Sequence, residues 1–274
     1  MADKKNAGAS SSPKKVQHTF TAANGSASST EKPPVNATPA APAEGKAGAG
    51  KYRIGAIALW LVALVFEVIA VLVLFEKLHW TFLPQLAIVI IALVLDLACV
   101  IVGSQLWKKS NRLDPASEKD KVKFWLWNNM GVIASVLAFV PFIILALTNK
   151  NADKKTKAIA TVVAVIALLV GGLCSYDWNP ISQEQKESEM AQYTQTVYWT
   201  KSGTVYHLNP DCSHLNHSEE LFYGDVEQAI EANKTRVCKD CEKKYNAEIE
   251  SGEREPFEGT TEEATAEFTV GVDD

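Results

Sequence analysis

Three cysteines and one histidine near the C-terminus are the residues of this 274-residue chain whose types and spacing imply a definite chemistry. His207 and Cys212 are separated by four residues, and Cys238 and Cys241 form a Cys-x2-Cys pair further along the chain. Thiolates and imidazoles are the usual ligands of a tetrahedral zinc site. Two ligand pairs would also fix a segment that is too short to fold on an apolar core of its own. The pattern therefore predicts a zinc-stabilised module.

Short strands, turns and one helix are expected to position these ligands. Residues 197–200 and 204–207 are rich in β-forming side chains, and Gly203 lies between them, which is typical of a hairpin. The Asn-Pro-Asp sequence at 209–211 predicts a tight turn that returns the next cysteine toward the hairpin. The module is thus expected to be α+β, because a helix should follow this turn.

The expected helix lies between the two ligand pairs. Asp225 and Gln228 fit a capping box, in which each side chain accepts a hydrogen bond from a backbone N–H of the first turn. The helix would run to about Ala232 and precede the Cys-x2-Cys turn.

A wider set of residues surrounds the ligands, namely Val197, Tyr198, Trp199, Thr200, Gly203, Tyr206, His207, Cys212, Leu215, Ser218, Ala229, Cys238 and Cys241. This set resembles a small zinc-binding module found at the ends of many bacterial nucleases, hydrolases and membrane proteins. That module is similar to the metal-binding domain of the Ada DNA-repair protein. The resemblance covers residues 197–245 and implies a bacterial protein with zinc at His207, Cys212, Cys238 and Cys241.

The ligand set separates a structural site from an alkyl acceptor. Ada-type domains use four cysteines, one of which accepts a methyl group from a DNA phosphotriester, whereas His207 stands here in place of a cysteine. His214 and His217 lie near Cys212 and are alternative fourth ligands, although the Tyr-His pair at 206–207 fits the resemblance better. No glutamate is placed as a base for a zinc-bound water, so an enzyme is not expected.

The charge of the module argues against nucleic-acid binding, which needs a positive face. Acids outnumber bases between residues 197 and 250, where the acids are Asp211, Glu219, Glu220, Asp225, Glu227, Glu231, Asp240, Glu242, Glu248 and Glu250. The bases are Lys201, Lys234, Arg236, Lys239, Lys243 and Lys244. A local patch from Lys234 to Lys244 is the part of the module that could still contact a nucleic-acid backbone. The expected partner is a protein.

Four apolar runs are long enough to cross a bilayer, which takes about 20 residues. They cover residues 54–75, 82–107, 124–148 and 158–176. Soluble helices are seldom apolar on every face, so the runs predict an α-helical integral membrane protein with four transmembrane helices in residues 51–178. The polar first fifty residues lack the apolar stretch of a cleaved signal peptide, so the first span would remain in the mature protein.

The remaining segments are polar. Residues 1–50 and the acidic residues 246–274 are expected to be disordered tails, because they carry too few apolar side chains to repay the entropy of ordering. Residues 179–196 are expected to be a linker that leads to the zinc module at 197–245.

Basic residues beside the spans predict that both termini lie in the cytoplasm, with the chain in a plasma membrane. Lys46, Lys51 and Arg53 precede the first span, and six further bases lie between residues 108 and 123 in the second connection. The third connection opposes this orientation, because its four lysines between residues 150 and 157 would face outward. A cytoplasmic module also suits three reduced thiols.

Glu67 and Asp96 are ionisable residues in the middle of the first and second spans. Such residues are costly in a bilayer and often mark functional sites. The preferred interpretation is two protonated carboxyls that hydrogen-bond between helices, in a membrane protein whose zinc module is a structural or protein-interaction domain. The alternative is a small transporter or channel that uses both acids and is regulated by the zinc module. An Ada-like DNA-binding or alkyl-accepting function comes third.

Overall fold

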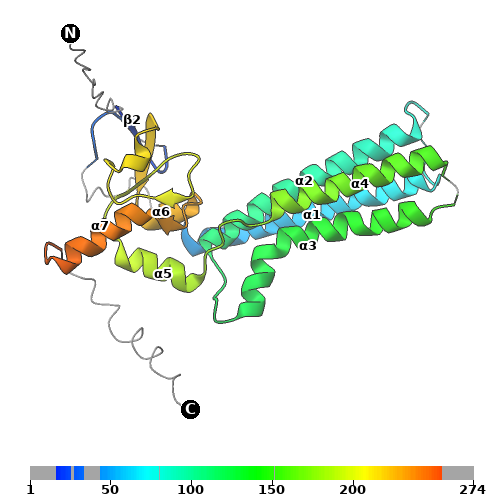
Figure 1. Ribbon diagram of the computed structural model, residues 1–274. Coiled ribbons are helices and arrows are strands. Elements are labelled where there is room, and N and C mark those ends of the chain that lie inside the picture. The colour runs from blue at the N-terminus through cyan, green and yellow to red at the C-terminus, as the bar shows by residue number, and fades with distance from the viewer. Residues whose placement is uncertain (1–16, 26–27, 34–43, 80, 151, 255–274) are drawn as a thin grey trace, which may run out of the picture.

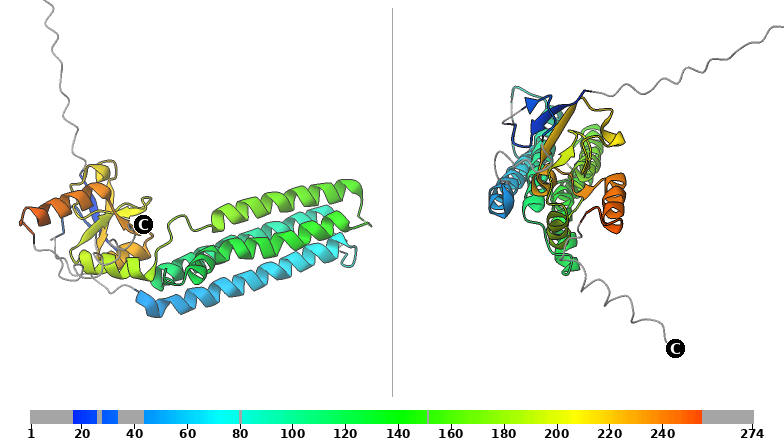
Figure 2. Two further views of the ribbon diagram at one scale, coloured as in Figure 1. Left: turned by 60° about the horizontal axis from the view of Figure 1, so that its bottom comes forward. Right: turned by 90° about the vertical axis from the view of Figure 1, so that its left-hand side faces the viewer.

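A computed structural model describes residues 17–25, 28–33, 44–79, 81–150 and 152–254 (Figure 1). Figures 1 and 2 show two parts joined end to end: a bundle of long helices, and a module of short strands and helices at one end of it. Each part has its own cluster of buried apolar side chains. We call the bundle end beside the module the proximal end and the opposite end the distal end.

The bundle consists of the helices α1 (Gly45–Leu74), α2 (Gln85–Leu113), α3 (Lys121–Thr148) and α4 (Lys154–Ser175). All four are long and apolar enough to cross a membrane, which confirms the four predicted apolar helices. Three of them extend beyond the predicted spans at the proximal end, because α1 begins before residue 54, α2 ends after residue 107 and α3 begins before residue 124. At the ends of α1 and α2, backbone groups form hydrogen bonds with side chains of the module, so helix continues where hydrophobicity stops.

Small residues let the bundle helices approach closely. Gly131 of α3 faces Ser104 of α2, and a Cβ atom built on this glycine would lie only 2.6 Å from the Ser104 Oγ. Large apolar side chains point outward instead, since Leu61, Leu137 and Leu173 are 60%, 61% and 62% exposed. The interior therefore combines small residues at close helix contacts with buried phenylalanine and leucine side chains, while large apolar side chains also cover the outside.

The strands of the module are β1 (Thr19–Ala22), β2 (Ser28–Ser29), β3 (Val197–Trp199), β4 (Val205–Tyr206), β5 (Glu220–Gly224) and β6 (Arg236–Val237). Its helices are α5 (Gln183–Gln192), the 3-10 turn η1 (Ser213–Leu215), α6 (Val226–Glu231) and α7 (Lys239–Glu250). One sheet has the order β2-β1-β5-β3, and β4 pairs with β6 in a second sheet. The predicted short helix is present as α6, with the capping box at Asp225 and Gln228.

The predicted hairpin forms only in part. Tyr198 and His207 exchange both backbone hydrogen bonds, at 2.8 and 2.7 Å, as expected for an antiparallel pair. Beyond this bridge the strands diverge, because β3 continues beside β5 and β4 continues beside β6. Each of these short strands forms more backbone pairs with its other neighbour, β5 or β6, than with the opposite strand of the hairpin.

The prediction that residues 1–50 are disordered was wrong at three described places: the start of α1, β2, and the buried strand β1. This strand lies parallel to β5, and Phe20 within it is only 5% exposed. The Phe20 ring meets the Tyr198 ring edge-on, with 6.1 Å between the centroids. Composition averaged over fifty residues hid a short run in which Phe20 and Ala22 alternate with threonine. Residues 1–16 lie outside the described part of the chain.

The predicted linker at 179–196 and the first residues of the predicted acidic tail are helical as well. α5 occupies much of the linker, and α7 continues to Glu250. α5 shows no apolar stripe because its buried face is polar: Lys186 is 7% exposed, and Glu189 accepts a hydrogen bond from the Tyr206 hydroxyl. Residues 255–274 lie outside the described residues, so the prediction for that part of the tail is untested.

Ion pairs and hydrogen bonds hold the module on the proximal end of the bundle. Lys186 of α5 pairs with Glu227 of α6 at 2.9 Å and donates to the carbonyl of Leu113, the last residue of α2, at 3.0 Å. Glu231 of α6 accepts a hydrogen bond from the N–H of Gly45, the first residue of α1, at 2.8 Å. The module is therefore connected to two bundle helices by side chains as well as by the chain itself.

Candidate metal centre

A parallel two-stranded ladder brings the two predicted ligand pairs together. Tyr206 of β4 lies opposite Val237 of β6, and the N–H of Cys238 donates to the carbonyl of Tyr206 at 2.8 Å. His207 follows β4 and Cys238 follows β6, so the ladder places these two residues side by side. The sequence did not predict this pairing, because only two residues of each strand take part in it.

Two local structures deliver the other ligands. The predicted turn at 209–211 is present, with the Asp211 N–H donating to the Asn209 side chain at 2.9 Å, and Cys212 follows it at the start of η1. Cys238 is the N-cap of α7, so Cys241 lies in the first turn of that helix. The positive end of a helix dipole favours thiolates, which suits both cysteines as metal ligands.

The four predicted ligands converge on one buried point. His207, Cys212, Cys238 and Cys241 are 4% to 6% exposed, and their ligand atoms all lie within 4.8 Å of one another. The three cysteines are free thiols rather than disulfides. Ligand atoms around a tetrahedral zinc ion, at about 2.0–2.3 Å from the metal, are separated by about 3.5–3.8 Å. The cluster could therefore hold a metal ion with small adjustments of the side chains.

Burial also sets the protonation of these ligands. It lowers the pKa of the His207 imidazole to about 4, so the ring is neutral near pH 7 and can donate a lone pair to a metal. Burial raises the pKa of both Cys212 and Cys241, so these thiols hold their protons until a cation replaces them. The backbone N–H groups of Leu208 and Asn209 offset part of the shift by donating to the Cys241 sulfur.

The alternative histidine ligands lie outside the cluster. Nε2 of His214 lies 2.7 Å from Oδ2 of Asp240, and both side chains of this pair are more than half exposed (58% and 61%). His217 is exposed. The geometry therefore favours His207 as the fourth ligand. The pair of His214 and Asp240 instead links the two ligand loops from the outside.

The residues that carry the resemblance to the Ada-like module are largely core positions. Val197, Tyr206, Leu215 and Ala229 are fully buried in the module. Their side chains surround the metal cluster, so packing around the ligands accounts for these residue types.

Lys234, at one end of the predicted basic patch, is committed to the fold. It is 3% exposed, and its ammonium group donates to the carbonyls of Lys201 and Gly203. The patch on the module is therefore smaller than the sequence indicated by one cation, and its exposed members are Arg236, Lys239, Lys243 and Lys244.

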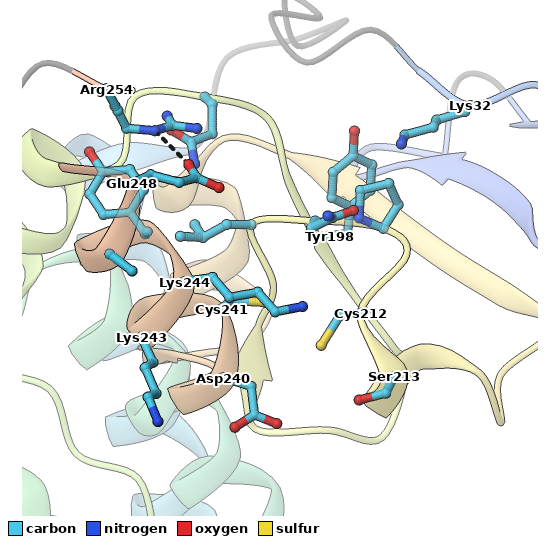
Figure 3. A pocket seen from close by; sticks show the side chains of 16 residues that line it. Lys32, Tyr198, Cys212, Ser213, Asp240, Cys241, Lys243, Lys244, Glu248 and Arg254 are labelled. Atoms are coloured by element: carbon cyan, nitrogen blue, oxygen red, sulfur yellow. Dashed lines mark hydrogen bonds and ion pairs between the residues drawn. The ribbon is translucent and has the colours of Figure 1, made fainter. Parts of the chain in front are cut away.

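A cavity of about 560 Å³ lies directly beside the metal cluster (Figure 3). Cys212 and Cys241 form part of its wall, and Tyr198, Leu208 and Tyr245 add apolar surface. The walls come from the N-terminal segment, the loop after β4 and α7. No local sequence pattern marks this cavity, because its walls come from separate segments of the chain.

Cations reach this cavity from both ends of the chain. Lys32 lies in the N-terminal segment and is paired with Asp211 at 3.1 Å, and Arg254 is paired with Glu248 at 3.1 Å. Lys244 makes no ion pair with a described residue, and Figure 3 shows it extending from α7 toward the side of the cavity that holds Cys212. The cavity thus combines aromatic walls, metal-site sulfurs and the ammonium group of Lys244, which has no ion pair among the described residues.

The two acids predicted in the spans are buried inside the bundle. Glu67 of α1 is 6% exposed and Asp96 of α2 is fully buried. Oε1 of Glu67 and both carboxyl oxygens of Asp96 have no hydrogen-bond partner among the described residues. The interhelical hydrogen bonds expected from a packing role are therefore not seen at Asp96.

No family model, no curated protein and no solved structure matches this chain. Function must therefore be derived from the metal centre, the adjacent cavity and the helix bundle.

Proposed function

We propose that this chain is an integral membrane protein of a bacterial plasma membrane that holds a zinc-stabilised module at one membrane surface, where the module binds a protein partner. Four long apolar helices with large apolar side chains directed outward support insertion into a bilayer. Three thiols and one imidazole support zinc as the metal, because they form the closed ligand set of structural zinc sites. Such a set leaves no position for a substrate, so the metal stabilises the fold and the protein is not an enzyme.

The cavity beside the metal cluster is the observation that carries the interaction proposal. Its walls include the two ligand loops, which zinc would hold together, so cavity and metal site are formed by the same residues. Tyrosine walls next to a free lysine suit a peptide segment that combines an apolar and an acidic side chain. Membrane attachment would keep the module, and therefore its partner, at the bilayer surface.

We place the proximal end on the cytoplasmic side. Lys46, Lys51 and Arg53 lie at the proximal end of α1, and the bases between residues 108 and 123 lie at the same end of α2 and α3. Three free thiols also suit a reducing compartment. Single cysteines introduced at positions 10 and 260 should resist an impermeant reagent in intact cells, and labelling of either would place that terminus outside.

Site-specific photo-crosslinking in native membranes tests the interaction. A photoreactive residue at position 208 or 244, inside the cavity, should capture a discrete partner, while one at exposed Glu219 of the same module should not. The crosslinks should disappear in the Cys238→Ser variant, because the ligand loops lose their shape. Equal crosslinking from the cavity and from position 219, or none from either, would reject the proposal.

Transport is a second candidate because of Asp96. A fully buried carboxyl without a described hydrogen-bond partner, next to a second buried acid in a helix bundle, is costly unless it serves a function. In this candidate Glu67 and Asp96 take up and release a proton or cation, and the zinc module regulates the bundle through α2.

An Ada-like DNA-binding or alkyl-accepting function has less support. The resemblance agrees with the metal ligands, but His207 stands where an Ada-type domain has a cysteine. The burial of Lys234 removes one cation from the side that could face phosphates.

A further inference from the structure

A groove of about 610 Å³ lies at the distal end of the bundle, where α3 ends and α4 begins. Lys150, Lys154 and Lys157 line it together with the apolar side chains of Leu147 and Val162. The groove is separate from the metal centre, which lies at the proximal end.

The lysines of this groove are available to a ligand. None of the three makes an ion pair with a described carboxylate, and the nearest acid in sequence, Asp153, accepts hydrogen bonds from the N–H groups of Lys155 and Thr156 as the N-cap of α4. Lys157 donates to the carbonyl of Asn149 at 3.0 Å, while Lys150 and Lys154 are exposed. Uncompensated cations at this end leave a site with a positive charge.

The backbone around the groove is held in place by the bundle. The Asn149 side chain donates to the carbonyl of Leu74, the last residue of α1, at 2.9 Å. This contact joins the α3–α4 connection to the first helix, so the lysines project from a fixed turn. Preformed geometry reduces the entropy that a ligand would have to offset.

A second, entirely apolar groove of about 240 Å³ continues from the first along α4. Both grooves share Ala158 and Val162, and the second adds Ile159 and Val163. Thr161 lines the first groove, and its hydroxyl has no hydrogen-bond partner among the described residues. The order along α4 is thus cations first and then apolar side chains.

We propose that these two grooves bind one anionic phospholipid. The headgroup phosphate lies among Lys150, Lys154 and Lys157, and an acyl chain follows Ala158, Ile159 and Val162 along α4. This inference rests on the proposed membrane location. A soluble anion would use the lysines but not the apolar groove, whereas a zwitterionic phospholipid would fill the apolar groove but bring a headgroup whose own positive charge offsets its phosphate.

Lipid retention by the purified full-length protein tests the proposal. Native mass spectrometry from detergent should show phosphatidylglycerol retained in preference to phosphatidylcholine. Changing all three lysines to glutamine should weaken retention of phosphatidylglycerol by about tenfold or more, since each lysine near a lipid surface contributes to anionic binding. Changing Lys119, Lys121 and Lys123 at the proximal end to glutamine removes the same charge and should change retention less than twofold.

Two further measurements distinguish the lipid from other anions. Ala158→Trp fills the apolar groove without changing the charge and should also weaken phosphatidylglycerol retention. Free glycerophosphoglycerol, which has the headgroup but no acyl chains, should not displace the lipid at matched concentration. Equal loss in both triple-lysine variants, unchanged retention in Ala158→Trp, or displacement by the free headgroup would overturn the proposal. Failure of the membrane proposal is a different result, namely protein that does not float with liposomes of any composition.

Discussion

Nδ1 of His207 lies 3.8 Å from Sγ of Cys241, although 34 positions separate the two residues in the chain. Between them the chain forms η1, β5, α6 and β6, so this contact closes a loop that contains about half of the module. Bridging a loop of this length restricts the unfolded chain strongly, and a metal that joins its ends should stabilise every element inside it.

Removal of one thiol should therefore unfold the module and not only empty the site. Purified wild-type protein should contain about one zinc per chain, and Cys238→Ser should lose it together with protection of α6 and α7 from limited proteolysis. Cys99→Ser, which changes a cysteine inside the bundle, is the matched control and should keep the metal. A Cys238→Ser protein with normal zinc content would show that the cluster is not the binding site.

Zinc affinity should increase with pH around neutrality. Because burial raises the pKa of Cys212 and Cys241, binding must expel their protons, and a higher proton concentration opposes it. His207 adds no such competition above about pH 5, because burial lowers its pKa to about 4. Competition with a chromophoric chelator at several pH values should show about two or more protons released per zinc. An affinity that is constant between about pH 6 and pH 8 would contradict the assignment of these ligands.

Phe20→Ala should destabilise the module although this residue precedes all four long helices. The side chain is 5% exposed and packs on Tyr198, so its truncation should cost about 3 kcal/mol. Hydrogen exchange of the β5 amides reports this loss locally. Ser29→Ala on the exposed strand β2 is the control and should change exchange little. Equal exchange in both variants would mean that β1 adds nothing to the sheet.

Lys186→Met should loosen the contact between module and bundle. The change leaves the Glu227 carboxylate and the last carbonyls of α2 without their donor, at a cost of about 2 kcal/mol. We expect faster hydrogen exchange at the end of α2 and the start of α6. Lys201→Met, at an exposed position of the module, should leave exchange at both places unchanged. Identical profiles for the two variants would remove Lys186 from the interface.

Glu67→Gln and Asp96→Asn separate the transport candidate from a structural role. Both amides keep the size and polarity of the acids, so the bundle should fold in either case. If the acids carry protons, each change should abolish pH-driven flux in proteoliposomes, because an amide cannot take up and release a proton. Ser135→Ala in α3 is the control. Wild-type protein without any flux would reject transport.

The features of this structure that could be predicted are those whose signal lies within a short stretch of sequence. Four apolar runs, the Asp225–Gln228 capping box and the four metal ligands each lie in a short stretch of sequence and are present in the structure. The parallel pairings of β1 with β5 and of β4 with β6 join distant segments through a few residues, and no local pattern marks them. α5 was interpreted as a linker because a helix that buries Lys186 and Glu189 looks polar throughout.

If the four long helices cross a bilayer as we propose, the position of β1 beside β5 makes the module a check on how the chain is inserted. These strands precede and follow all four long helices, so they can meet only if the number of crossings is even. A molecule in which one helix failed to insert would hold Phe20 on one surface and β5 on the other. Its sheet would keep an unpaired edge, which proteases and chaperones recognise in misfolded chains. Only a molecule with an even number of crossings would complete its sheet, so quality control could detect the failure of one helix by inspecting a domain outside the membrane.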